Sequence, residues 1–137
     1  MHMRRGDFTH VRRDTVPSLD EIVTAASQQC TQRQLCTVFM ATDAAEEERL
    51  YLKSSAPASL KLAFFDRTTS TDHDRLHDAE RAIVEQLLCT WADWFVGSHE
   101  STFSTVIRQE REMNHMSAAS TDNVLCKTGT SRCIAPV

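Results

Sequence analysis

This sequence has little of the material from which common nucleotide-binding motifs are built. Only three of its 137 residues are glycine, at positions 6, 97 and 129. No Gly-x-Gly-x-x-Gly or Gly-x-x-x-x-Gly-Lys-Ser/Thr pattern occurs, so neither the dinucleotide fingerprint nor the P-loop supports a nucleotide site. A Gly-x-Ser-x-Gly elbow is missing as well, which removes the usual sequence sign of a serine hydrolase.

Long apolar runs and an excess of charge of one sign are also absent. No run approaches the roughly 20 residues that a membrane-spanning helix needs, so we expect no membrane span. The formal net charge of -4 gives no overall attraction to nucleic acid, and we expect no nucleic-acid partner. The first seven residues are charged and precede no apolar segment, so no secretory signal is expected. With 41% hydrophobic residues, the chain can bury the core of one ordinary domain.

The five cysteines fall into two groups. Cys30, Cys36 and Cys89 lie in or beside apolar stretches, which is typical of small buried thiols. Cys126 and Cys133 close a short polar loop with a central glycine, and such a loop can bring two Cα atoms into bonding range. We therefore predict a Cys126–Cys133 disulfide, which implies an oxidising compartment. A zinc site would need four suitably spaced ligands, and no CxxC or HxxxH partner is near.

Short apolar runs alternate with helical patterns along the chain. Ser18 followed by Glu21 is a capping-box start for a helix, and Thr42 and Asp43 can cap the helix expected from Ala44. Strands and helices alternate about four times, which predicts the α/β class, a single domain and a largely parallel sheet. The expected strands are Met1–Arg4, Thr37–Ala41, Leu60–Phe65 and Trp94–Gly97, and the expected helices start near Ser18, Ala44, Asp74 and Ser101.

Polar clusters follow predicted strand ends, where open α/β sheets bind their ligands. The first cluster runs from His2 to Asp7 and holds two arginines beside a carboxylate. Such a fork suits phosphate, with Asp7 able to hold one guanidinium in place. A solvated charge cluster is the alternative, and the sequence leaves both interpretations open.

The second cluster follows Gly97, where small hydroxyl residues open a helix. Free backbone N–H groups at that helix start, with the hydroxyls of Ser101, Thr102 and Ser104, would form an anion site. Capping of the helix by serine or threonine is the simpler alternative, and the residue types alone favour it.

The third candidate is Glu85, a carboxylate among apolar neighbours. It could accept two hydrogen bonds from the N1–H and N2–H₂ edge of guanine. An exposed polar position on an amphipathic helix is the alternative. His73 and His77 stand four residues apart, as metal ligands on a helix can, but the aspartates around them favour a polar capping turn. No metal site is predicted.

Five short motifs occur in an order that resembles the protein O-fucosyltransferase family. They are His-Met-Arg-Arg-Gly-Asp-Phe, Val-Pro-Ser-Leu-Asp, Val-Phe-Met-Ala-Thr-Asp-Ala, Ile-Val-Glu-Gln, and Phe-Val-Gly followed by Thr-Phe-Ser. Arg108–Glu112 and the terminal Cys-x6-Cys add to the resemblance. Each motif is modest, but the ordered set is specific and covers essentially the whole chain.

The resemblance implies a Rossmann-like parallel sheet flanked by helices, as in the C-terminal domain of a two-domain GT-B glycosyltransferase. It implies an inverting enzyme that needs no obligatory metal or other cofactor and uses GDP-fucose as donor. The implied acceptors are serine or threonine hydroxyls of thrombospondin type 1 repeats. The matching positions assign donor contacts to His2, Met3, Arg4, Glu85, Thr102 and Phe103, and catalytic roles to Arg4 at the departing phosphate and to Asp7, which orients it.

Two features of the chain depart from the family pattern. Glu85 falls where the family uses aspartate and is one methylene longer. The family's catalytic base lies in an N-terminal half with no counterpart here, so we expect a truncated donor domain over residues 1–114, an irregular tail over 115–137, and no transfer by this chain alone. The resemblance places the intact protein in the endoplasmic reticulum lumen. A non-enzymatic module that binds GDP or a GDP-sugar is the alternative function.

Overall fold

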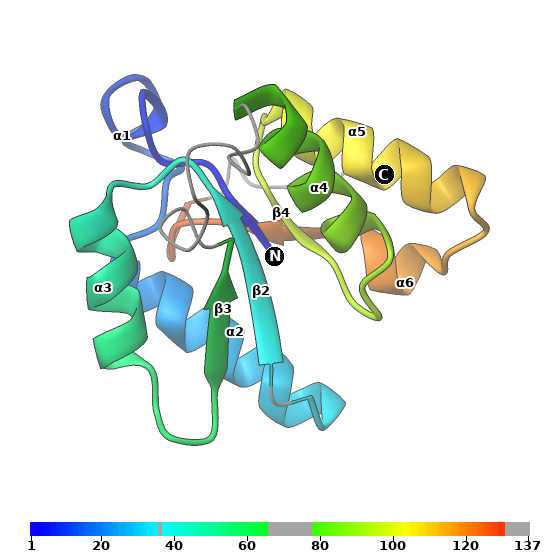
Figure 1. The fold of residues 1–137 in the computed structure, drawn as a ribbon. Helices are drawn as coiled ribbons and strands as arrows, with labels where there is room; N and C mark the ends of the chain where they lie inside the picture. The colour runs from blue at the N-terminus through cyan, green and yellow to red at the C-terminus, as the bar shows by residue number, and fades with distance from the viewer. Residues whose placement is uncertain (36, 66–77, 131–137) are drawn as a thin grey trace, which may run out of the picture.

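The computed structural model describes residues 1–35, 37–65 and 78–130 (Figure 1). Helices and strands alternate through most of this chain, as the sequence predicts for the α/β class. The elements, in chain order, are β1 (His2–Met3), α1 (Phe8–Val11), α2 (Leu19–Arg33), β2 (Thr37–Thr42), α3 (Glu46–Ser55), β3 (Lys61–Phe64), α4 (Asp78–Thr90), β4 (Val96–Ser98), α5 (Thr102–Met113), α6 (Ala118–Thr121) and β5 (Asn123–Leu125).

The strands are parallel and form two hydrogen-bonded groups. In the first the order is β1-β2-β3, with His2 opposite Ala41 and Thr37 opposite Lys61. In the second β4 pairs with β5. The two groups meet where β4 lies against β1, and the hydroxyl of Ser98 bridges them by donating to His2 O at 3.1 Å. The parallel arrangement predicted from the sequence is confirmed.

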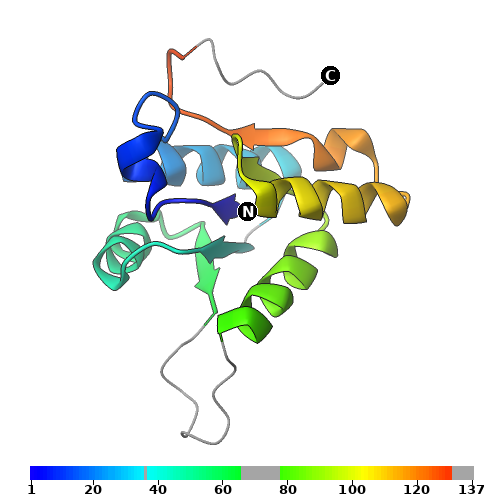
Figure 2. The same ribbon diagram turned by 90° about the horizontal axis from the view of Figure 1, so that it is seen from above.

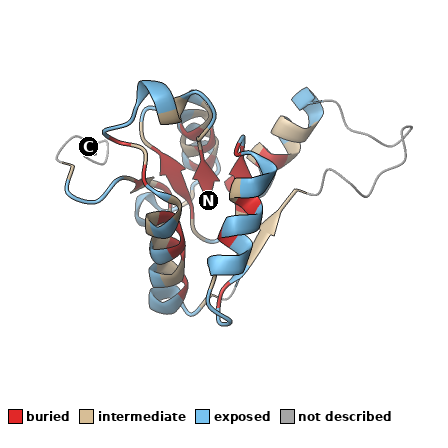
Figure 3. Ribbon diagram, turned by 90° about the vertical axis from the view of Figure 1, so that its left-hand side faces the viewer, coloured by how far each residue is buried: buried red, intermediate tan, exposed pale blue. Residues whose placement is uncertain are grey.

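Helices cover both sides of the strands (Figure 1). α2 packs with α3 on one side, and α4 packs with α5 on the other. Successive side chains of β2 point to opposite faces of the sheet. Met40 belongs to the core cluster with α2, and Ala41 belongs to the cluster with α4 and α5. Figure 3 shows buried strands at the centre, β3 with intermediate burial beside them, and exposed outer helix faces. This is a Rossmann-like arrangement.

Local signals in the sequence predict the start of α2 correctly, but they do not predict the start of α3. α2 begins after a full capping box, in which Ser18 Oγ accepts from Glu21 N and Glu21 Oε2 accepts from Ser18 N. The predicted cap of α3 by Thr42 or Asp43 is wrong. The N-cap is Ala45, and Thr42 Oγ1 instead donates to Met3 O at 2.7 Å, tying β2 to β1.

The sequence predicts an irregular segment after Asn114, and this prediction is wrong. The segment contains α6 and β5, and β5 pairs with β4, with Val96 opposite Asn123. Figure 2 shows this segment running beside α5. The domain therefore continues beyond residue 114, because its second strand group is complete only with β5.

Arg111 fixes this segment to the rest of the domain. Its side chain is fully buried in α5. Nη1 donates to Thr90 O at 2.8 Å and to Ala92 O at 2.6 Å, while Nη2 donates to Ser120 O at 3.2 Å and Nε to Thr121 Oγ1 at 3.2 Å. One guanidinium thus satisfies carbonyls from the end of α4 and from α6.

Some sequence predictions fall outside the described residues. These are the loop Arg67–His73, the first turn of the helix expected from Asp74, the pair His73 and His77, and Cys36 and Cys133. The fourth strand, expected over Trp94–Gly97, is observed as β4 one to two residues later. No helix in the described part of the chain is long and apolar enough to cross a bilayer.

Candidate functional site

A pocket of about 330 Å³ opens at the carboxyl edge of the strands. It gathers residues that are far apart in the sequence, from the end of β1, the end of β2, α4 and the start of α5. Four of the six predicted donor-contacting residues are in its lining. The lining consists of His2, Arg4, Thr42, Asp43, Asp78, Arg81, Ala82, Glu85 and Phe103.

Arg4 directly follows β1 and lines this pocket with its positive charge. Its Nη2 lies 2.8 Å from Asp7 Oδ1 and its Nη1 lies 2.9 Å from Asp43 Oδ2. The side chain remains 38% exposed, so it is held in orientation without being enclosed. Gly6 permits this geometry, because a Cβ there would overlap the Asp43 carboxylate. The guanidinium is therefore preorganised to meet an anion at the pocket.

Arg5 does not join Arg4 in a phosphate fork, which corrects the prediction of two arginines. Its Nη2 donates to Glu48 Oε1 at 2.5 Å and its Nη1 donates to Pro17 O at 2.8 Å. The side chain is only 12% exposed. Arg5 thus joins β1 to α3 and to the start of α2, and of these two arginines only Arg4 lines the pocket.

His2 is buried between β4 and α5. Its Nδ1 lies 2.7 Å from Ser104 Oγ, and its ring centroid lies 4.6 Å from that of Phe103. Ser98 N donates to the same Ser104 Oγ, so this hydroxyl links the His2 ring to β4. Burial is the largest cause that lowers the pKa of His2 to about 3, and the positive charges of the Met1 amino group, Arg4 and Arg108 contribute to this shift. His2 is therefore neutral at physiological pH.

Ser98 and Ser104 are the residues whose roles the sequence did not reveal. Ser104 was expected at an anion site, yet its side chain is fully buried and its hydroxyl is used by His2 and Ser98. Ser98 Oγ accepts from Arg4 N at 2.7 Å and donates to His2 O. Gly97 makes room for this network, since a Cβ there would lie 2.8 Å from Ser104 Oγ. Both serines position the main chain that carries Arg4.

The start of α5 is not capped by a side chain. Ser101 is the N-cap, but its hydroxyl makes no capping hydrogen bond, which argues against the simpler capping interpretation. The N–H groups of the first turn have no partner within the helix. Phe103 lines the pocket, whereas Thr102 is exposed beside it. The start of α5 therefore lies beside the pocket at Phe103.

Glu85 is buried, with 7% of its surface exposed, and lines the pocket from α4. The alternative of an exposed position on an amphipathic helix is wrong. Met3, by contrast, has its side chain in the hydrophobic core with Ile22 and is absent from the pocket lining. Its placement does not support a donor contact by its side chain.

Similarity to known proteins decides the family of this chain. Residues 2–114 match the family model of GDP-fucose protein O-fucosyltransferases. The chain belongs to this family. Relatives named GDP-fucose protein O-fucosyltransferase 2 are 37% identical over 132 residues in Drosophila melanogaster, 33% over 136 residues in Caenorhabditis elegans and 32% over 136 residues in Homo sapiens. The alignments cover 96% to 99% of this chain, but only 27% of the fly protein and 31% of the other two.

Family membership confirms the resemblance found in the ordered motifs. The chain is an O-fucosyltransferase by family, and hence a glycosyltransferase family member, although it spans less than a third of the length of these curated relatives. The motif His-Met-Arg-Arg-Gly-Asp-Phe is the segment that supplies His2 and Arg4 to the pocket. Four of the five motifs thus supply residues to one pocket.

The cysteines agree in part with their predicted roles. Cys30 and Cys89 are buried cysteines that form no disulfide, as expected. Cys126 is not among the free cysteines of the described residues. Because Cys133 lies outside those residues, the Cys126–Cys133 disulfide stays a prediction.

Lowering the pH is expected to destabilise the fold through His2. The pKa is about 3 in the folded chain and near its ordinary value of 6.5 when unfolded, so the unfolded chain binds more protons between these values. The contribution of His2 is complete above pH 6.5 and is lost as the pH falls toward 3, at up to about 1.4 kcal/mol per pH unit. Urea unfolding of the wild type and of His2→Asn at pH 7.5 and pH 5 measures this contribution.

The His2→Asn chain should lose less stability between the two pH values than the wild type does. The same substitution at His10, which is exposed on α1, should leave the pH dependence as in the wild type. Equal losses in the wild type and His2→Asn would show that His2 is not the group responsible.

Proposed function

We propose that this chain is the GDP-fucose-binding part of a protein O-fucosyltransferase. The observation that carries the proposal is that His2, Arg4, Glu85 and Phe103 line one pocket although they come from three separate parts of the fold. A preorganised cation suits a diphosphate, and a buried carboxylate suits the donor edge of guanine. The carboxyl edge of a parallel sheet is where such ligands bind.

The pocket suggests a role for each group toward the donor. Arg4, held by Asp7 and Asp43, would neutralise charge on the β-phosphate, and the free amides at the start of α5 would contact phosphate oxygens. Glu85 would accept from N1–H and N2–H₂ of guanine. His2, neutral and packed against Phe103, would offer its ring nitrogen Nε2 to a polar group of the donor.

In the whole protein the reaction would be an inverting transfer. The oxygen of a serine or threonine hydroxyl would attack C1 of fucose and give its proton to a base in the rest of the protein. The bond from C1 to the β-phosphate oxygen would break, and GDP would leave with the bonding electrons. Arg4 would stabilise the charge that develops on that phosphate. We propose thrombospondin type 1 repeats as acceptors, a GT-B architecture without an obligatory metal, and the endoplasmic reticulum lumen as location.

Nucleotide selectivity tests the proposed function at Glu85. A carboxylate offers two acceptors to guanine, whereas the amide of Glu85→Gln offers one acceptor and one donor, a pattern that suits adenine instead. We expect the wild-type chain to bind GDP in preference to ADP and Glu85→Gln to lose at least about tenfold of that preference. Titration calorimetry with GDP and ADP measures both affinities.

The matched control is Glu80→Gln, which changes an exposed carboxylate on the same helix. It should leave the preference for GDP unchanged. If the wild type bound both nucleotides equally, or if Glu85→Gln kept the full preference, guanine recognition by Glu85 would be ruled out.

A further inference from the structure

Arg108 on α5 carries a positive charge for which the fold supplies no partner. Among the residues that the structure describes, its Nε and Nη2 atoms are buried without a hydrogen bond, and its guanidinium forms no ion pair. Arg111, three residues further along the same helix, is also buried, but it donates to the carbonyls of Thr90 and Ala92. Hydrogen bonding within the fold therefore explains Arg111 and does not explain Arg108.

The guanidinium of Arg108 extends back toward the start of α5, as helix side chains do. A Cβ on Gly97 of β4 would lie 2.9 Å from Arg108 Nη2 and 2.8 Å from Ser104 Oγ, so both atoms lie over the same glycine. Ser104 Oγ in turn lies 2.7 Å from Nδ1 of His2, which lines the nucleotide pocket. The charge of Arg108 is therefore close to the pocket wall that His2 forms.

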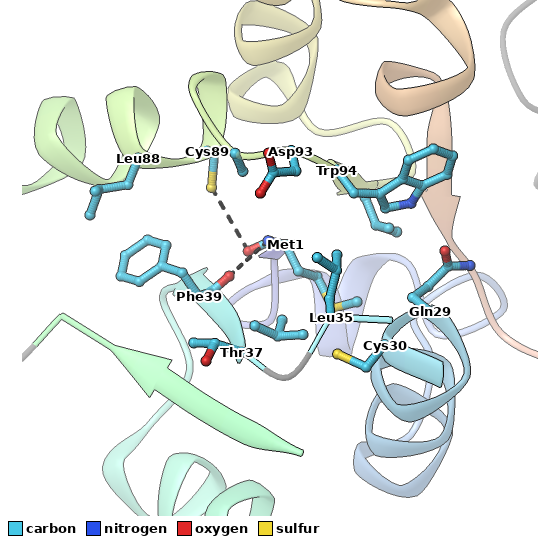
Figure 4. Close-up of a pocket in the computed structure, with 13 residues that line it drawn as sticks. Met1, Gln29, Cys30, Leu35, Thr37, Phe39, Leu88, Cys89, Asp93 and Trp94 are labelled. Atoms are coloured by element: carbon cyan, nitrogen blue, oxygen red, sulfur yellow. Dashed lines mark hydrogen bonds between the residues drawn. The ribbon is translucent and has the colours of Figure 1, made fainter. Parts of the chain in front are cut away.

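Three positive charges act on the His2 ring, and two of them belong to groups with partners. These charges are carried by the Met1 amino group, Arg4 and Arg108. The Met1 nitrogen donates to Phe39 O at 2.7 Å (Figure 4). Arg4 is held between two carboxylates. Arg108 is the member of this group whose charge is left uncompensated.

Arg108 keeps its charge at neutral pH. Burial lowers the pKa of Arg108 below its ordinary value, and the negative charge of Asp122 opposes this shift. A guanidinium nevertheless remains protonated in proteins. Because solvent does not reach Nε and Nη2, the charge is screened less than that of an exposed cation. It can therefore act on an anion in the pocket without touching it.

We propose that Arg108 supplies a second positive charge to the diphosphate of the donor, through space and from behind the pocket wall at His2. This inference rests on the proposed GDP-fucose site. Arg4 would meet phosphate oxygens directly, whereas Arg108 would raise the positive potential in the same place and add to the positive end of the α5 dipole. A bound diphosphate would in turn offset the cost of holding an unpaired charge inside the domain.

Arg108→Met tests the proposal, because methionine removes the charge and keeps an unbranched apolar side chain. We expect the variant to bind GDP about 3- to 10-fold more weakly than the wild type. The loss should be smaller for GMP, which carries less negative charge, and Arg108→Lys should bind GDP more tightly than Arg108→Met. Titration calorimetry measures these affinities. Unchanged affinity for GDP, or equal losses for GDP and GMP, would overturn the proposal.

Thermal unfolding separates an effect on the ligand from an effect on the fold. Removing a buried charge that has no partner should leave the midpoint of Arg108→Met equal to or above that of the wild type. Weaker GDP binding by a chain that is no less stable would support the proposal. A lower midpoint together with wild-type affinity for GDP would show that Arg108 serves the fold instead.

The matched control is Lys61→Met, which removes one positive charge from an exposed residue at the start of β3, at the opposite edge of the sheet. It should bind GDP as the wild type does. ADP separates this proposal from guanine recognition, because Arg108→Met should weaken ADP and GDP by the same factor. A wild-type chain that bound both nucleotides equally would contradict guanine recognition, while a weaker affinity of Arg108→Met for both would still support the role of Arg108.

Discussion

Arg4→Ala is expected to weaken GDP binding by about 10- to 100-fold, the largest loss among single changes at the pocket. The guanidinium is the preorganised cation of this pocket, with ion pairs to Asp7 and Asp43. Its removal takes away the contact to phosphate and leaves both carboxylates without their cation close to an anionic ligand. Titration calorimetry of the wild-type and Arg4→Ala chains with GDP gives the two dissociation constants.

Two variants separate loss of a specific contact from loss of positive charge. Arg4→Lys keeps the charge but not the fork that meets two oxygens at once, so an intermediate affinity is expected. Arg33→Ala removes the same charge at the end of α2, where β2 begins, and should bind GDP as the wild type does. An Arg4→Ala chain with wild-type affinity would mean that the phosphate site lies elsewhere.

Arg111→Ala is expected to lower the free energy of unfolding by about 3–5 kcal/mol, because it leaves buried carbonyls without a donor. The groups affected are Thr90 O at the end of α4, Ala92 O just after α4 and Ser120 O in α6. For a chain of this size the thermal midpoint should fall by roughly 10 °C or more. Urea unfolding and thermal unfolding at neutral pH measure the change.

Gln109→Ala is the matched control for Arg111→Ala. Gln109 lies on the exposed side of the same helix, and its loss should change stability by less than about 0.5 kcal/mol. Should Arg111→Ala unfold like the control, the hydrogen bonds from Arg111 would not be what fastens α6 and β5 to the domain.

The sequence was informative wherever a signal is local. The capping box at Ser18 involves only residues three apart, and it is present as predicted. The apolar run Val38–Ala41 of β2 is short and lies between two threonines, which favours a strand in the interior of a parallel sheet. β5 carries no comparable signal. Its three residues become a strand only by pairing with β4, so the end of the domain was misplaced.

Some features of the candidate site could be predicted from the sequence, and others could not. The ordered motifs identified the residues to consider, and four of the predicted donor contacts do line one pocket. Adjacent arginines could not be told apart, because the choice depends on Glu48 in α3, which draws Arg5 away. The network of Ser98 and Ser104 was likewise hidden, since a serine near a helix start resembles a cap until the neighbouring strand is in place.

By itself, then, the sequence determined the α/β class, the parallel strands and the family, because these follow from periodicity and ordered motifs that lie along the chain. Only the tertiary structure decided that Arg4 and not Arg5 faces the pocket, that Glu85 is buried there, and that β5 completes the second strand group. Each of these depends on a partner far away in sequence. The direction and burial of a side chain are set by that partner and not by its neighbours along the chain.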